Sequence, residues 1–301
     1  MPIVPPPVRT GFRLLGTVAP PLATALGVRA MRRVGPPARV RPVDAEVHDA
    51  ARRGSLDIDG ERVATYAWGD AAAPPVLLVH GWQLRASRLA RLVEAFLAAG
   101  LRPVAFDGVA HGDSTGRRTQ AVQHARVLRA VQEQAGHALA VVGHSLGAMA
   151  AGLALRDGLA ADRLVAIAAP TGFESVIGSF VRQSGIPPRL HDRLAERAAR
   201  VMFPDVGAPR TELDLTRHPV PPGVPTLFVQ STTDSMNDPD NARRLHAAHP
   251  GSEMLVAPGL GHNRVLDDPE VLRAVVDHVT ATRPTGAGPV ASPAWTRSRT
   301  L

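Results

Sequence analysis

Short, unbroken apolar runs recur along this chain with helix-length stretches between them, and this alternation restricts the fold more than any other feature. The runs lie at 76–79, 103–106, 139–142, 164–168, 226–229 and 254–257. Stretches with helical spacing lie at 87–99, 120–134, 148–156, 239–248 and 269–282. Strands that are apolar on both sides are typical of a parallel sheet that helices cover on both faces. The pattern therefore predicts an α/β protein with a doubly wound, mostly parallel sheet.

Two segments depart from that alternation. Residues 56–58 and 62–68 flank Asp59 and Gly60, a dipeptide typical of tight turns, and predict an opening β-hairpin. The segment between 170 and 225 contains amphipathic helical stretches without a convincing strand, and it is too long for a plain loop. We interpret it as a helical cap inserted over the carboxyl ends of the strands, where open α/β sheets bind ligands.

The chain of 301 residues is long enough for one large domain with additions. We expect the core at 55–170 and 224–282 and the cap insertion at 171–223. Residues 1–54 form a Pro/Arg-rich extension that we expect to be docked or partly disordered. Residues 283–301, rich in Gly, Pro, Ser and Arg, are predicted to be disordered.

The composition is basic, yet it does not indicate a nucleic-acid partner. The formal net charge is +7, and all 34 basic residues are arginine. Arginine without lysine, in a chain rich in Ala, Gly and Pro, fits a GC-rich coding bias better than a selected basic surface. The apolar pieces of the extension are too short to span a bilayer, so membrane contact is expected at most through an amphipathic arm of an otherwise cytoplasmic protein. The absence of cysteine excludes disulfides and a cysteine nucleophile.

Ser145 lies at the centre of the pentapeptide Gly143-His144-Ser145-Leu146-Gly147, directly after an apolar run and before an alanine-rich helical stretch. In that setting G-x-S-x-G forms a nucleophile elbow, because the glycines let strand and helix cross closely while the serine takes a strained, exposed position. The motif predicts acyl-group chemistry.

A serine nucleophile needs a base, and the base needs an acid that fixes its tautomer. His262 follows a glycine-flanked loop after the last predicted strand and is the favoured base. The weaker alternatives lie in helices, at their ends or near the cap: His218, His246, His249 and His278. Asp234, just beyond the strand at 226–229, is the favoured acid, with Asp238 and Asp240 as competitors. Asp238 precedes a proline at a predicted helix start, where capping would explain it.

The remaining site residues surround the elbow. The backbone amides of Trp82 and Leu146 are predicted to form the oxyanion hole. The predicted pocket residues are Trp82, His144, Phe173, Phe180, Met202 and Phe203. Five histidines in one half of the sequence show no metal-ligand spacing: His80, His111, His124, His137 and His144. No phosphate-binding glycine loop is present either, so we expect neither metal nor cofactor.

Together, these motifs resemble the α/β-hydrolase superfamily over residues 55 to 282. The resemblance includes His80-Gly81, the turn from Asp107 to Ser114, the elbow, and the acid and histidine in the expected order. It implies that Ser145, Asp234 and His262 form a catalytic triad, while Asp107, His111 and Ser114 shape their turn. Two positions depart from the pattern, because Ala110 and Ser231 stand where glycine is usual.

The predicted function is hydrolysis of a carboxylic ester or related acyl bond of a small apolar substrate through an acyl-enzyme. The same triad would serve a thioesterase, an acyltransferase, or a cofactor-free haloperoxidase or perhydrolase. A non-catalytic binding domain with this fold is the alternative from another class.

Overall fold

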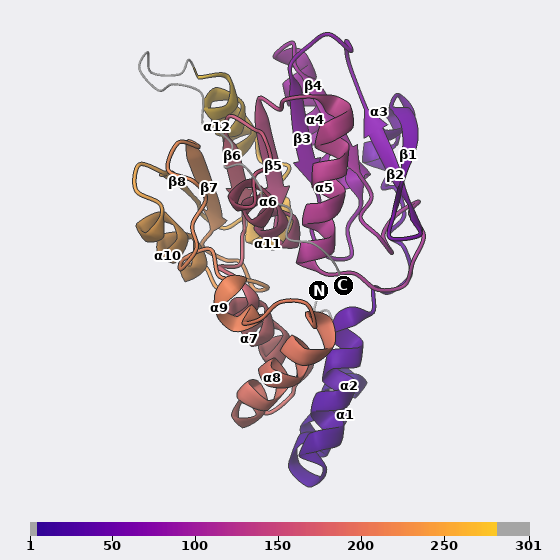
Figure 1. Cartoon of the computed structure of the whole chain (residues 1–301), viewed down its shortest axis with the longest axis vertical. Helices are drawn as coiled ribbons and strands as arrows, with labels where there is room; N and C mark the ends of the chain where they lie inside the picture. The colour runs from indigo at the N-terminus through magenta and orange to yellow at the C-terminus, as the bar shows by residue number, and fades with distance from the viewer. Residues whose placement is uncertain (1–4, 282–301) are drawn as a thin grey trace.

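A computed structural model describes residues 5–281, and its central element is an eight-stranded sheet (Figure 1). The strand order is β1-β2-β4-β3-β5-β6-β7-β8, with β2 antiparallel to β1 and β4 and all other neighbours parallel. The strands are β1 (Arg52–Ile58), β2 (Glu61–Ala67), β3 (Pro75–Val79), β4 (Arg102–Phe106), β5 (Ala140–His144), β6 (Leu164–Ile167), β7 (Thr226–Ser231) and β8 (Glu253–Ala257). The predicted α/β fold with a mostly parallel sheet is confirmed. The predicted disordered tail, 283–301, lies outside the described residues.

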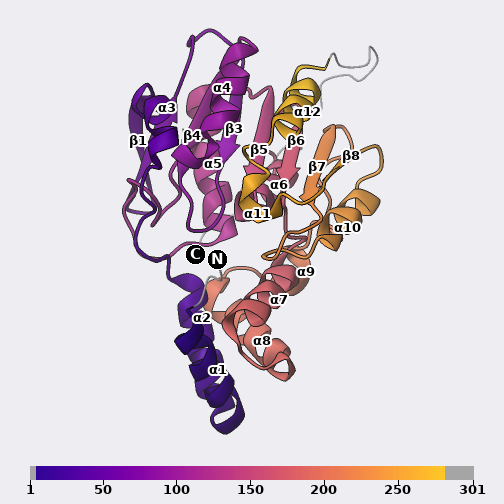
Figure 2. The same ribbon diagram turned by 180° about the vertical axis from the view of Figure 1, so that it is seen from behind.

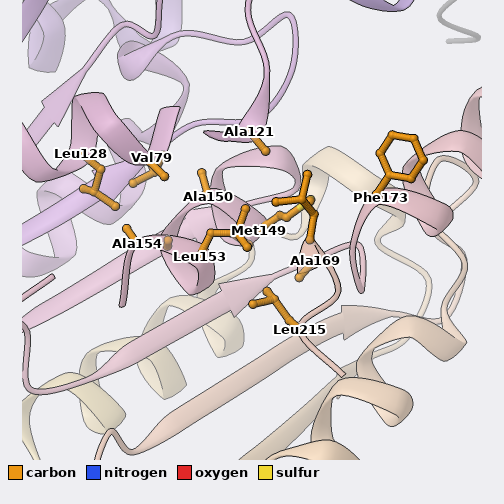
Figure 3. Close-up of a cluster of buried hydrophobic side chains, with 14 of the residues drawn as sticks. Val79, Ala121, Leu128, Met149, Ala150, Leu153, Ala154, Ala169, Phe173 and Leu215 are labelled. Carbon is orange, nitrogen blue, oxygen red and sulfur yellow. The ribbon is translucent and has the colours of Figure 1, made fainter. Parts of the chain in front are cut away.

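Helices cover both faces of the sheet because successive strand residues point to opposite sides. In β3, Leu77 and Val79 pack with the layer of α5 and α6, whereas Val76 and Leu78 pack with the layer of α4 and α12. Figure 3 shows side chains of α6 gathered with Val79 in the first of these layers. The core helices are α3 (Ala45–Asp49), α4 (Ala90–Ala98), α5 (Ala121–Ala135), α6 (Leu146–Arg156), α10 (Asp240–Ala248), α11 (Gly261–Arg264) and α12 (Pro269–Thr280), with short 3₁₀ helices at Pro42–Asp44 and Ala86–Leu89.

The segment between β6 and β7 is helical. It contains α7 (Phe173–Ser184), a 3₁₀ turn (Pro188–Leu190), α8 (His191–Met202) and α9 (Pro209–Glu212). These helices lie together at one end of the sheet, beyond the carboxyl ends of the parallel strands (Figure 1). The amphipathic pattern that distinguished this segment follows from burial of one face of α8, at Leu194, Ala195 and Ala198.

The N-terminal segment forms a helical hairpin of α1 (Pro6–Val18) and α2 (Pro20–Arg32), which packs against α7 and α8 (Figure 2). Prolines that seem to interrupt the apolar pieces occupy the first turns of both helices, where proline is well tolerated. Gly16 and Gly27 permit the close packing, because a Cβ at Gly16 would lie 2.3 Å from Pro187 and one at Gly27 would lie 2.8 Å from Ile186. No described helix is both long and apolar enough to cross a membrane.

Candidate active site

Ser145 sits on a sharp turn between β5 and α6. Its φ of 54° and ψ of −121° lie in a region that residues other than glycine rarely adopt. A Cβ at Gly143 would lie 2.5 Å from the Cα of Ala148, and one at Gly147 would lie 2.3 Å from the carbonyl oxygen of Val79. Both glycines are therefore required for strand and helix to cross, and that crossing holds the serine in its strained conformation.

His262 and Asp234 form a buried pair at the carboxyl edge of the sheet. The His262 Nδ1 lies 2.8 Å from the Asp234 Oδ2, and the two side chains are 7% and 0% exposed. Burial alone would raise the pKa of Asp234, but hydrogen bonds from His262 and from the N–H groups of Asn237 and Met236 lower it below 3.8. An ionised Asp234 keeps the proton of His262 on Nδ1 and leaves Nε2 as the basic nitrogen.

Asp238 takes a different position. Its side chain is half exposed, and it accepts a hydrogen bond from the N–H of Asp240 at the start of α10. Ser231, which stands where glycine is usual, accepts a 2.8 Å hydrogen bond from the N–H of Gly261. Ser231 thus connects the loop that carries Asp234 to the loop that carries His262.

The competing histidines near the end of the chain have other partners. His246 Nδ1 lies 2.8 Å from Ser252 Oγ, His249 Nε2 accepts the N–H of Val220, and His278 pairs with Glu253. Unlike these histidines, His262 forms a hydrogen bond with Asp234.

His144 was predicted to line the pocket, and this prediction is wrong. Its side chain is almost fully buried, and its Nε2 donates a 2.9 Å hydrogen bond to the carbonyl of His262. The two imidazole rings lie 4.8 Å apart. Burial and the neighbouring His262 lower the pKa of His144 to about 3, so it is neutral near pH 7. The residue before Ser145 therefore supports the loop that carries His262.

The loop after β3 lies directly against the elbow. A Cβ at Gly81 would lie 3.0 Å from the Cβ of Ser145. Within residues 5–281, the N–H groups of Trp82 and Leu146 have no hydrogen-bond acceptor. Leu146 is the first residue of α6, where N–H groups have no partner within the helix. Two unpaired N–H groups beside a serine can receive a negatively charged oxygen.

The turn after β4 supports that loop. The N–H of Gln83 donates to His111 Nε2 over 3.0 Å, and the buried Asp107 accepts the N–H of Ala86 over 2.7 Å. Ser114 Oγ donates to the carbonyl of Asp107. Ala110, which replaces the usual glycine, adopts a φ of 67°. Asp107, His111 and Ser114 therefore have structural contacts in this turn.

Three buried histidines gather behind this loop, which the sequence spacing did not indicate. Ring nitrogens of His80, His111 and His124 lie within 4.8 Å of one another. His80 Nε2 accepts the N–H of Gly108, and His111 Nε2 accepts that of Gln83, while the Nδ1 of each donates to a carbonyl. His124 Nε2 is the one ring nitrogen of the three without a partner among the described residues. A hydrogen-bonded cluster with one free nitrogen does not fit a metal centre, which needs three or four ligands.

A cavity of about 380 Å³ opens beside Ser145. Five predicted pocket residues line it, namely Trp82, Phe173, Phe180, Met202 and Phe203. The N-terminal hairpin also lines it through Phe12 and Met31, which sequence reasoning did not include. The signal that could have found them is the spacing of Phe12 to Gly16 and of Gly27 to Met31, which places a small and a large residue on one helix face.

Fold, elbow and buried pair together define an α/β protein of the hydrolase type. The model of the alpha/beta hydrolase family matches residues 76–275, more than half of the chain, and the chain belongs to this family. A comparison with curated protein sequences gives no match.

Solved structures with the same fold include three with names that indicate different activities. A Pyrococcus furiosus esterase is 18% identical, with 82% of this chain and 97% of that chain covered and a TM-score of 0.61. A membrane phospholipase A described as a bacterial virulence factor is 19% identical, with coverages of 91% and 98% and a TM-score of 0.58. A thioesterase domain from the curacin biosynthetic pathway is 18% identical, with coverages of 76% and 99% and a TM-score of 0.55. At these identities the likeness concerns the fold.

Proposed function

We propose that this protein is a serine hydrolase that cleaves a carboxylic ester, or a related acyl bond, of a small apolar substrate. Ser145 Oγ attacks the carbonyl carbon while His262 Nε2 takes the hydroxyl proton. The tetrahedral intermediate collapses when its bond to the leaving alcohol breaks and the proton passes from His262 to that alcohol. Water then attacks the acyl-enzyme, His262 takes its proton and returns it to Ser145, and the acid is released.

The observation that carries this proposal is the 2.8 Å contact between His262 Nδ1 and Asp234 Oδ2, together with the positive φ of Ser145. An imidazolium that forms in a buried site needs a negative partner, and the lowered pKa of Asp234 keeps that partner ionised. Asp234 stays ionised throughout and does not take the proton.

Two further features support acyl transfer at Ser145. The unpaired N–H groups of Trp82 and Leu146 would stabilise the oxyanion as charge develops, a contribution of about 3 kcal/mol per donor in such sites. The cavity is within the size range of small-molecule pockets, and aromatic and methionine side chains line much of it. Such a lining favours an apolar acyl group.

The test is hydrolysis of nitrophenyl esters and acyl thioesters of increasing chain length by wild type and Ser145→Ala. We expect ester hydrolysis with a clear optimum of chain length, and loss of at least about a thousandfold in kcat for the variant. A strong preference for thioesters would reassign the enzyme to thioester cleavage with the same residues. Equal rates for the folded variant and wild type would refute the proposal.

A further inference from the structure

The N-terminal hairpin carries an apolar surface that nothing in the described structure covers. Leu14 and Val18 of α1 are 63% and 78% exposed, and Leu22 and Leu26 of α2 are also exposed. We call these four side chains the hairpin face. Together with Val8 they make up five of the nine large apolar side chains that are exposed in residues 5–281. Exposed apolar side chains that gather on one element mark an interaction surface.

The helical spacing shows that the hairpin face is separate from the packed face. Leu14 and Val18 are four residues apart, as are Leu22 and Leu26, so each pair forms one row along its helix. In α1, Phe12 and Gly16 are buried instead, and in α2 the buried row includes Ala23 and Gly27. Each helix therefore has one apolar side that packs on the protein and a second that faces outward.

The packed face of the hairpin, which includes Gly16 and Gly27, is held against the helical segment between β6 and β7. Besides the close approach of Gly16 and Gly27, Arg189 donates a 2.9 Å hydrogen bond to the carbonyl of Gly16. The carbonyl of Arg9 lies so close to Gly185 that a Cβ there would approach it to 2.5 Å. Since these contacts hold the hairpin from its inner side, the hairpin face remains outward while the hairpin is docked.

The hairpin itself carries charge of one sign. The first 43 residues contain seven arginines and neither Asp nor Glu. Arg13 and Arg29 are exposed, and they form no ion pair within the described part of the chain. Exposed apolar side chains flanked by arginines, without acids, match the surface of an anionic lipid bilayer, which accepts both.

The hairpin also connects the outside to the cavity. Val8, near the start of α1, and Ala30, near the end of α2, line the cavity that contains Ser145. The turn between the helices lies at the far tip of the molecule (Figure 2). The hairpin therefore has exposed apolar side chains near its tip and lines the cavity at its other end.

We propose that the hairpin face docks on an anionic lipid surface, and that an apolar acyl chain enters the cavity at the end of the hairpin that lines it. Docking depends only on the surface of the hairpin, whereas entry of an acyl chain rests on the proposed function.

The test uses full-length protein with Ser145→Ala, so that binding is measured without turnover. Sedimentation compares vesicles of phosphatidylcholine with vesicles that also contain phosphatidylglycerol. We expect binding to the mixed vesicles, and a loss of at least about tenfold when Leu14, Val18 and Leu22 are all replaced by serine. Replacement of Arg13 and Arg29 by glutamine should weaken binding by roughly fivefold per arginine.

Matched controls are the exposed side chains Leu97 and Val256 replaced by serine, and Arg243 and Arg273 replaced by glutamine. These should bind vesicles like the parent protein. In the active background, unchanged hydrolysis of a soluble short-chain ester by the triple-serine variant would show that it is folded. Equal vesicle binding by parent and triple-serine variant would overturn the proposal. A hairpin-dependent dimer without vesicle binding would also overturn it, since the face would then join two copies of the chain.

Discussion

The two sides of the cavity are built in different ways. On the side of Ser145, backbone geometry and hydrogen bonds fix each residue, through the strained turn, the glycines of the elbow and the four hydrogen bonds to Asp234, two of them from backbone N–H groups. The opposite wall consists of apolar side chains from α1, α2, α7 and α8, which come from segments far apart in the sequence. We therefore expect reactivity to depend on exact backbone positions, and substrate choice to depend on replaceable side chains. Changes on the first side should alter rate, and changes on the second should alter preference.

The largest expected effect is on the base. Replacement of His262 by glutamine should lower kcat by roughly a thousandfold to ten-thousandfold, because Ser145 would lose its proton acceptor. His246→Gln is the matched control, since His246 lies exposed on α10. Steady-state kinetics with a nitrophenyl ester measures both. A loss of less than tenfold in a folded His262→Gln protein would contradict the assigned base.

The next effect concerns the elbow. A methyl group at Gly147 would lie 2.3 Å from the carbonyl oxygen of Val79 and 2.5 Å from that of His80, and these are backbone atoms that cannot move aside like a flexible side chain. We expect Gly147→Ala to lower the free energy of unfolding by about 3 kcal/mol or more, measured by urea denaturation. Gly178→Ala in α7 is the control, because its Cβ would have only ordinary contacts and should stabilise the helix slightly. Equal stabilities would show that the crossing of β5 and α6 is looser than described.

Acidification should destabilise the catalytic side through its buried histidines. Burial lowers the pKa of His80 to about 4 and that of His144 to about 3, from the ordinary value of 6.5. The unfolded chain therefore binds protons at a higher pH than the native protein. Stability is fully present above pH 6.5 and falls as the pH drops toward 4, by up to about 1.4 kcal/mol per pH unit for each such histidine.

Urea midpoints measured across that pH window check this slope. His124→Gln should make the slope shallower, because the pKa of His124 is also lowered by burial, whereas the exposed His137→Gln should leave it unchanged. A midpoint that stays constant across the window would contradict the neutral, buried state of these side chains.

The catalytic side was also the more predictable from sequence. Continuous apolar runs located every strand of the parallel sheet, because the inner strands are buried on both faces and the partly exposed edge strand β8 is still mostly apolar. The choice between Asp234 and Asp238 depended on the shape of one loop, and the contact with His262 became visible only in the structure. His144 was misplaced because the reversal of the chain at Ser145 directs neighbouring side chains to opposite sides. The cluster of His80, His111 and His124 forms from two loops and helix α5, which are distant in sequence, so no spacing could reveal it.

The wall was less predictable, because its residues follow no motif. Phe173, Phe180, Met202 and Phe203 could be predicted from their place in an inserted segment. Phe12 and Met31 were missed because prolines concealed the helices that carry them, although their spacing to Gly16 and Gly27 was a usable signal.

The smallest effect tests the wall directly. Met31→Trp should fill part of the cavity and shift the optimum toward shorter acyl chains. We expect kcat/KM for the longest good substrate to fall by roughly tenfold, as for the loss of one to two buried methylene groups, with acetyl esters changed by less than about twofold. Val201→Trp, on an exposed position of α8, is the control. An equal loss for all chain lengths would mean that the hairpin supports the catalytic side instead.

The most direct test of the central claim is the site and rate of labelling by a fluorophosphonate, measured by peptide mass spectrometry. We predict one adduct on Ser145, no adduct in Ser145→Ala, slow labelling in Asp234→Asn, and normal labelling in Asp238→Asn. Labelling that persists in the folded Ser145→Ala protein, or that depends on Asp238 and not on Asp234, would contradict that claim.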